Sequence, residues 1–195
     1  GPRRRTNGHS PRARKGCIGE ALVIGGGVAG LQAAVLTAKA GLNTLVLSGG
    51  EPLVCSTDKI QNLVTRERLA GEDLVETGRE RVRAFDGEIR EETVTALTRE
   101  GSPGPLTATT ESDTTHTGES VVVATASGLD FLDPLEEELA FTDGREGQFT
   151  MERHVETDEA NRATENVYVA GLANTWEYQT AVAIGDGAKA GVNLV

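Results

Sequence analysis

Three glycines near the start of the chain have the spacing that binds a dinucleotide. Gly25, Gly27 and Gly30 form the pattern G-x-G-x-x-G. The first glycine permits a tight turn, the second lets backbone approach a pyrophosphate, and the third lets a helix pack closely on a strand. The free N–H groups of the next helix, near Val28 and Ala29, would face the phosphates at its positive dipole end. The motif predicts a pyrophosphate site; the alternative is a glycine-rich turn in an ordinary α/β domain.

The segments on both sides of these glycines are those of a β-α-β unit. Residues 21–24 form an apolar strand, helical spacing of apolar residues follows, and Gly41 suits the position after a helix C-terminus. Residues 44–47 form a second apolar strand. A glycine motif placed between a strand and a helix is more specific than the motif alone.

The end of the second strand carries the candidate ribose contacts. In a dinucleotide-binding fold an acid at this point binds the ribose hydroxyls. This chain has Ser48 and Gly49 there, and the nearest acid is Glu51. We expect Ser48 and the glycine backbone to serve the ribose with Glu51 close by; a solvated loop charge is the alternative for Glu51.

The remaining segments predict a parallel sheet with a small antiparallel meander. A helix is expected up to residue 84, followed by a turn and meander strands with turns at residues 102–104 and near 113. Continuous apolar runs indicate buried parallel strands at residues 120–124 and 166–171. The other expected elements are a strand at 92–98, short strand pieces at 106–109, 139–141 and 148–151, and a final helix at 179–195.

Charge is distributed unevenly along the chain. The net charge is −11, yet residues 1–15 hold six basic side chains and no acid. Residues 1–19 are expected to be a disordered basic leader, and residues 20–195 a single domain. So acidic a body argues against a nucleic-acid partner, and no apolar run approaches the length of a membrane span. A cytoplasmic protein is expected, and the lysine-poor acidic surface resembles that of proteins from salt-loving archaea.

In order and spacing these segments resemble the FAD-binding domain of thioredoxin-reductase-like flavoproteins, within the pyridine nucleotide-disulfide oxidoreductases. The resemblance runs from about residue 21 to residue 195. It implies an α/β, three-layer FAD/NAD(P)-binding Rossmann-like fold, with a parallel central sheet and a small antiparallel β-meander. The matching segments are residues 25–30, Asn62 with the helix starting near residue 71, and residues 85–97, 121–125, 157–158, 162–164, 166–171 and 178–182.

FAD is the cofactor that the resemblance implies, with the backbone near Gln179 and Thr180 at the isoalloxazine edge. The glycine motif and the resemblance together give one set of expected FAD-binding residues. They are Gly25, Gly27, Val28, Ala29, Gly30, Ser48, Gly49, Glu51, Asn62, Val94, Ala124, Thr125, Ala126, Gly171, Leu172, Gln179 and Thr180.

Several features of that family are missing. A short acidic segment, residues 129–153, stands where relatives insert an NAD(P)H-binding domain, and there is neither a second G-x-G-x-x-G nor a Cys-x-x-Cys. The family's Ala-Thr-Gly ends in Ala126, and its Gly-Asp, whose Asp bonds the ribityl chain, reads Gly171-Leu172. Losing that charge-assisted hydrogen bond removes roughly 1.5–3 kcal/mol of FAD binding. Asn174 or Asp186 is a candidate substitute.

Cys55 is the weak catalytic candidate, because the resemblance brings its loop near the flavin. A thiol there could form a mixed disulfide or a flavin adduct, and the alternative is a small buried hydrophobe. His116 and His154 lack a second ligand at metal spacing, so solvated histidines and no metal site are expected.

The resemblance implies an FAD-dependent oxidoreductase without a dithiol relay or a built-in NAD(P)H domain. Its electron donor would be NAD(P)H or a redox protein, and a homodimer is possible in this family. The alternative is a non-catalytic flavin- or nucleotide-binding module that senses redox state or docks a partner. Trp176 and Tyr178 either stack on the cofactor or pack in the core.

Overall fold

The computed structural model describes residues 18–147, 149 and 151–195. Most of the expected leader, residues 1–17, lies outside the described residues. The first strand begins at Ile18, so residues 18 and 19 belong to the sheet and not to a leader. In the described part of the chain, no helix is long and apolar enough to cross a membrane.

The elements follow one another in a β-α-β order with a meander in the middle. They are β1 (Ile18–Ile24), α1 (Val28–Lys39), β2 (Thr44–Leu47), η1 (Leu53–Ser56), α2 (Gly71–Ala84), β3 (Glu88–Arg90), β4 (Val94–Arg99), β5 (Leu106–Thr110), β6 (Thr115–Val123), η2 (Asp130–Glu138), β7 (Phe141–Asp143), β8 (Arg153–Val155), β9 (Arg162–Thr164), β10 (Val167–Val169), η3 (Gly171–Ala173) and α3 (Thr180–Leu194).

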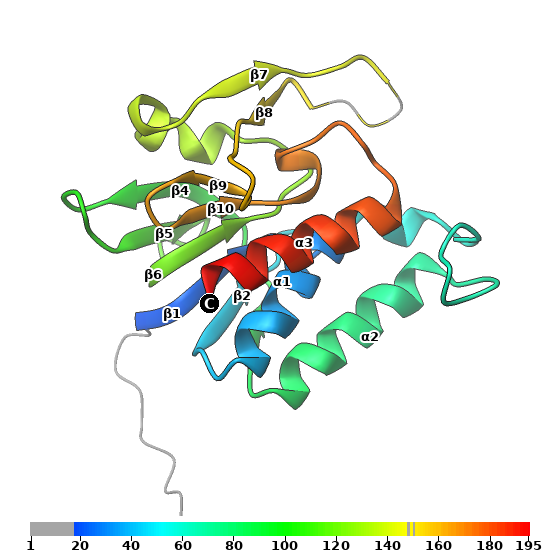
Figure 1. Ribbon diagram of the computed structural model, residues 1–195. Coiled ribbons are helices and arrows are strands. Elements are labelled where there is room, and N and C mark those ends of the chain that lie inside the picture. Colours follow the sequence, from blue (N-terminus) through cyan, green and yellow to red (C-terminus); the bar gives the residue numbers. More distant parts are fainter. Residues whose placement is uncertain (1–17, 148, 150) are drawn as a thin grey trace, which may run out of the picture.

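The central sheet has the strand order β3-β2-β1-β6-β10-β9. Strands β3, β2, β1, β6 and β10 are parallel, and β9 is antiparallel to β10. The meander branches from this sheet, since β6 also pairs antiparallel with β5, and β5 with β4. Figure 1 shows α1, α2 and α3 together on one face of the parallel strands, with the meander on the other. The expected three-layer Rossmann-like architecture is confirmed.

The central strands contribute side chains to two separate hydrophobic cores, one on each face of the sheet. Leu22 and Ile24 of β1 pack on the meander side, whereas Val23 between them packs on the helix side. The same alternation holds for Val46 in β2 and Val122 in β6, whose neighbours face the meander. Because side chains alternate between the faces of a strand, a continuous apolar run is what a strand covered on both faces requires.

Three short strands differ from the sequence-based expectation. Strand β3 lies within residues 85–97, which the resemblance gives as one strand but which the structure divides between β3 and β4. The β7–β8 hairpin lies two to five residues beyond the strand pieces expected at 139–141 and 148–151. Residues 148 and 150 of the second piece lie outside the described residues. Strands of three residues cannot show a full alternation, so long-range pairing and not local pattern decides where they form.

Candidate dinucleotide cleft

The carboxyl ends of the parallel strands meet at one edge of the sheet, and two adjoining cavities open there. The "glycine cavity", about 240 Å³, is lined by residues 25–27 and 49–51, by residues 92–94 and by residues 124–128. The "apolar cavity", about 150 Å³, lies toward the starts of α1 and α3. Both cavities share Gly27, Pro52, Leu53 and residues 124–126, so together they form one continuous cleft. In open α/β sheets, ligands bind in this crevice.

The three motif glycines differ in what surrounds them. Gly25 has φ +116°, a conformation that favours glycine, and a Cβ there would run into the Ala124 carbonyl. A Cβ on Gly30 would strike the Gly25 carbonyl oxygen, because α1 packs directly against the turn. A Cβ on Gly27 would meet nothing nearer than Pro52, at 3.9 Å, so Gly27 borders open space in the cleft.

The start of α1 supplies the donors for an anion. Gly27 precedes the helix without a side-chain cap, and the first intrahelical bond runs from the Leu31 N–H to the Gly27 carbonyl. The N–H groups of the first turn, including those of Val28 and Ala29, are therefore left for a ligand. Among the described residues no lysine or arginine lines either cavity, so backbone N–H groups and the helix dipole are the positive features of the cleft.

The glycine cavity gathers most of the expected ribose-side residues. Gly49, Glu51 and Val94 line it, and so does Glu92, which the sequence did not single out. The Glu92 carboxylate lies 2.7 Å from His116 Nε2. Two carboxylates at this end suit the hydroxyl groups of a ribose.

Ser48 is not among the residues that line the cavities. Its side chain is buried against Gly26, where an added Cβ would overlap it, and its Oγ lies 3.4 Å from Arg79 Nη2. Ser48 therefore supports the glycine turn from behind. The backbone of Gly49 and Gly50 forms the cavity wall instead.

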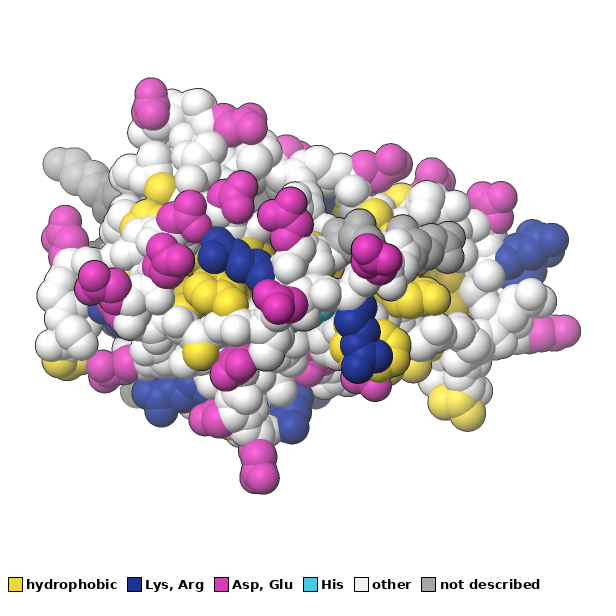
Figure 2. Space-filling view, turned by 90° about the horizontal axis from the view of Figure 1, so that it is seen from above, with side chains coloured by type: hydrophobic (Ala, Val, Ile, Leu, Met, Phe, Trp, Pro, Cys, Tyr) yellow, Lys and Arg dark blue, Asp and Glu magenta, His cyan; other side chains and the backbone are white. Residues whose placement is uncertain are grey.

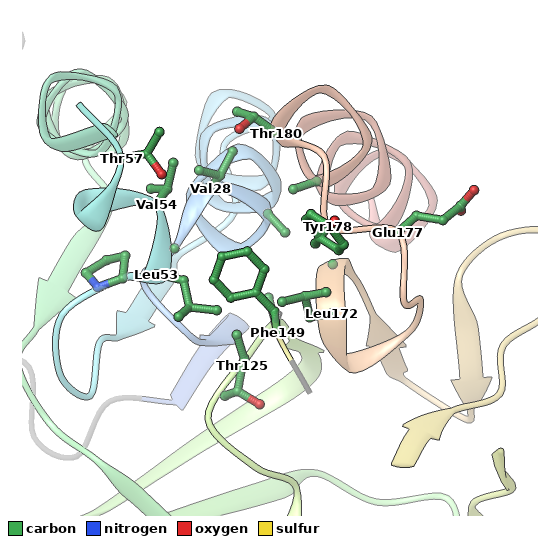
Figure 3. A pocket seen from close by; sticks show the side chains of 17 residues that line it. Val28, Leu53, Val54, Thr57, Thr125, Phe149, Leu172, Glu177, Tyr178 and Thr180 are labelled. Carbon is green, nitrogen blue, oxygen red and sulfur yellow. The ribbon is translucent and has the colours of Figure 1, made fainter. Parts of the chain in front are cut away.

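The apolar cavity is lined mainly by aliphatic and aromatic side chains from six segments of the chain (Figure 3). Within the described residues, Glu177 is the only charged side chain in its wall. The expected residues in the wall are Gly27, Val28, Ala29, Ala124, Thr125, Ala126, Gly171, Leu172 and Thr180. Leu53, Val54 and Thr57 also line it and lie in the irregular segment 53–65, whose length and polarity predict a ligand-lining loop. The wall residues that the sequence did not single out are Pro52, Phe149, Glu177 and Ala183.

Two aromatic side chains, Phe149 and Tyr178, stand at this cavity. Their ring centroids are 5.3 Å apart in an edge-to-face arrangement, and Tyr178 is half exposed. Tyr178 therefore lies at the cavity and not in the core, and Trp176, also half exposed, is covered by Arg145 at 4.2 Å from its ring centroid. No local pattern around Phe149 signals this position, which depends on chain segments 29 residues apart.

The side chains of Asn62 and Gln179 contact each other at the N-terminus of α3. Asn62 Nδ2 donates to Gln179 Oε1 over 2.6 Å, and Gln179 is the residue that precedes Thr180 at the helix start. Neither side chain lines a cavity, but the bond brings the loop before α2 next to the start of α3. The resemblance linked these two residues to one site, and they do lie together.

Cys55 lies outside both cavities, in the short helix η1. It is partly buried and packs against the helix-side core. Burial raises the pKa of its thiol, and the carboxylates of Glu51 and Glu72 raise it further. The thiolate form, which is the nucleophile, is thus disfavoured.

Both expected solvated histidines are buried, which corrects the sequence-based expectation. His116 pairs with Glu92, and His154 Nδ1 lies 2.7 Å from the Leu172 carbonyl oxygen. These partners are 24 and 18 residues away, so only the folded sheet brings them together. In the part of the chain that the structure describes, no group of three metal-binding side chains exists.

Comparisons with known proteins agree with this geometry. Residues 20–104 match the family described as FAD binding domain. No curated protein sequence matches the chain.

Solved structures share the fold over nearly the whole chain. The atypical thioredoxin reductase TRi from Desulfovibrio vulgaris Hildenborough has a TM-score of 0.70 and 19% identity, covering 89% of this chain and 96% of its own. The oxidoreductase from Agrobacterium tumefaciens has a TM-score of 0.74 and 14% identity, covering 91% and 97%. Thioredoxin reductase from Streptococcus pyogenes has a TM-score of 0.73 and 14% identity, covering 92% and 98%.

The fold is thus that of the FAD-binding domain of thioredoxin-reductase-like flavoproteins, as the resemblance implied. FAD is the cofactor that the family match assigns to residues 20–104.

Proposed function

We propose that the cleft binds FAD along its length and that the bound flavin passes electrons between an external donor and an acceptor. The observation that carries this proposal is the pair of cavities that adjoin at Gly27. A dinucleotide needs two pockets on either side of a pyrophosphate site, and the uncapped start of α1 lies where they join. Residues 20–195, together with the strand start at Ile18, would act as a single FAD-binding domain.

Each part of the cleft has chemistry that suits one part of FAD. The glycine cavity, with Gly49, Glu51 and Val94, would take the adenosine, and the N–H groups of Val28 and Ala29 the pyrophosphate. The apolar cavity, with Thr180 in its wall, would take the flavin ring. Its aliphatic wall excludes water, and the positive end of the α3 dipole favours negative charge on a bound flavin.

The flavin itself supplies the redox chemistry when bound. In the described residues the wall of the apolar cavity holds no cysteine, histidine, lysine or arginine. Cys55 lies outside the wall with a disfavoured thiolate. This composition supports electron transfer by the flavin alone, without a dithiol relay, to or from NAD(P)H or a redox protein. The cytoplasmic location and the homodimer stay predictions.

A non-catalytic flavin-binding sensor or docking module is the second candidate. The composition of the apolar cavity's wall favours it. Its described residues include no cysteine, histidine, lysine or arginine, and such a wall can hold a flavin without offering a reaction to a substrate. The two functions differ in whether the bound flavin accepts electrons from common donors.

The test is anaerobic reduction of the FAD-loaded protein by NADH, NADPH or reduced ferredoxin. Loss of absorbance near 450 nm followed by reoxidation with a dye acceptor is the result expected of an oxidoreductase. Flavin that stays bound and oxidised with all three donors would contradict the oxidoreductase and support the sensor. A Cys55→Ala variant should be reduced at the same rate as the unchanged protein.

A further inference from the structure

The turn η3 forms part of the wall of the apolar cavity. It follows β10 and contributes Gly171 and Leu172 to the cavity wall. Gly171 has φ +70° and lies so close to α1 that an added Cβ would be 3.0 Å from the Ala29 Cβ. A turn of three residues has few hydrogen bonds of its own, so side chains from elsewhere must fix its position.

Asp186, on α3, holds the start of this turn. Its Oδ2 accepts the Gly171 N–H over 2.7 Å and Asn174 Nδ2 over 3.2 Å, while its Oδ1 accepts Asn161 Nδ2. Asn174 Oδ1 in turn accepts the Thr157 hydroxyl over 2.8 Å. Asp186 does not line either cavity. Its carboxylate is therefore engaged by the protein and does not replace the missing ribityl contact.

His154, on β8, holds the other side of the turn. Its Nδ1 is 2.7 Å from the Leu172 carbonyl oxygen, and the side chain is 5% exposed. Because a carbonyl oxygen can only accept, Nδ1 carries the proton. The buried Nε2 has no hydrogen-bond partner among the described atoms, so the bond to Leu172 is the polar contact that orients the ring.

We propose that Asp186 and His154 are positioning residues for the flavin end of the cleft. Asp186 reaches η3 from α3, and His154 reaches it from β8. Together they fix Gly171 and Leu172 without touching the ligand. This inference rests on the proposed function, since it assigns the apolar cavity to the flavin. It implies that the β7–β8 hairpin, which stands where relatives insert a second domain, helps to shape the cofactor site through His154.

The experiment compares two ligands that fill different parts of the cleft. FAD needs both cavities, whereas ADP needs only the glycine cavity and the start of α1. We expect His154→Phe and Asp186→Asn to raise the dissociation constant of FAD about tenfold, the effect of one lost hydrogen bond. The dissociation constant of ADP should stay within about twofold, because η3 does not border the glycine cavity.

A conservative variant separates positioning from general packing. His154→Asn keeps a side-chain N–H that can reach the Leu172 carbonyl, so it should restore FAD binding to within about threefold of the unchanged protein. Thr37→Val is the matched control, because it removes the buried Thr37–Thr44 hydrogen bond of 2.9 Å, away from both cavities. It should lower the unfolding temperature without changing the ratio of FAD to ADP affinity.

Three results would overturn the inference. Equal weakening of FAD and ADP would mean a loss of general structure, and unchanged FAD binding in both variants would mean that η3 needs neither side chain. An unchanged protein that binds ADP but not FAD would instead refute the proposed function, and the inference with it.

Discussion

Gly27 and Gly30, three residues apart, serve opposite purposes. Gly30 is needed for packing, since a Cβ would strike the Gly25 carbonyl and lie 3.3 Å from a methyl group of Val23. Gly27 is not needed for packing, since its φ of −81° suits any residue and its surroundings are open, so the proposed ligand is what a glycine there would serve. The sequence motif names both glycines, but only the structure separates their functions.

Alanine at each glycine should therefore produce different defects. Gly30→Ala should lower the free energy of unfolding by about 2 kcal/mol through overpacking. Gly27→Ala should leave stability within about 0.5 kcal/mol and weaken FAD binding about tenfold, because a methyl group would occupy the approach to the pyrophosphate. Urea unfolding and FAD titration measure the two effects. Equal loss of stability in both variants would contradict this division.

The thiol of Cys55 gives a prediction with a pH dependence. Burial and nearby carboxylates raise its pKa above the ordinary value of 9.0, so the thiol is protonated at neutral pH. Its alkylation by iodoacetamide should reach half-maximal rate above pH 9.0, which is a higher pH than a free cysteine in an unfolded peptide requires. A half-maximal rate near pH 7 would show an activated thiolate and reopen a catalytic assignment.

At the scale of elements, the meander is joined to η2 by one buried arginine. Arg99 of β4 is 2% exposed at its side chain, and its Nε lies 3.1 Å from the Glu138 carboxylate of η2. Its Nη1 also donates to the Gly104 carbonyl over 3.0 Å. The contact between η2 and the meander thus depends on the buried charge of Arg99, which has several partners.

Removing the Arg99 side chain should destabilise the folded protein. Arg99→Met should lower the free energy of unfolding by about 3 kcal/mol, since it leaves the Glu138 carboxylate and the partly buried Gly104 carbonyl without their donor. The control is Arg83→Met, whose exposed pair with Glu76 at 3.6 Å should contribute less than about 0.5 kcal/mol. Similar effects of both variants in urea unfolding would refute the special place of Arg99.

The elements also show how far the sequence could lead. Strands β1 and β2 and helices α1 and α2 were predicted because glycines, apolar runs and helical spacing are local signals. The contacts of His154 with Leu172 and of Asp186 with Gly171 were not, because they join residues 15 to 18 positions apart. Ser48 misled for the same reason: its place in the chain suggests a ribose contact, yet its side chain packs under Gly26.

At the scale of the whole molecule, acidic side chains dominate the surface. Figure 2 shows many separate carboxylates and few basic groups on the face seen from above. The net charge of the chain is −11, and all of its acidic residues lie after residue 15. Such a charge excess destabilises the compact state by self-repulsion, which salt screens.

Salt should therefore stabilise this protein. The thermal unfolding temperature should rise by about 10 °C or more between low and molar potassium chloride, as expected of a protein adapted to high salt. Sucrose at matched osmolality is the control, because it does not screen charge. An unfolding temperature that does not respond to salt would contradict the prediction that this protein is adapted to high salt.

The central claim is that the whole cleft binds FAD, and one titration tests it most directly. Purified protein, freed of nucleotide and shown to be folded, is titrated with FAD while flavin absorbance and bound ligand are measured. We predict one FAD per chain with absorption bands near 370 and 450 nm shifted from those of free FAD. A folded protein that takes up no FAD would contradict the account.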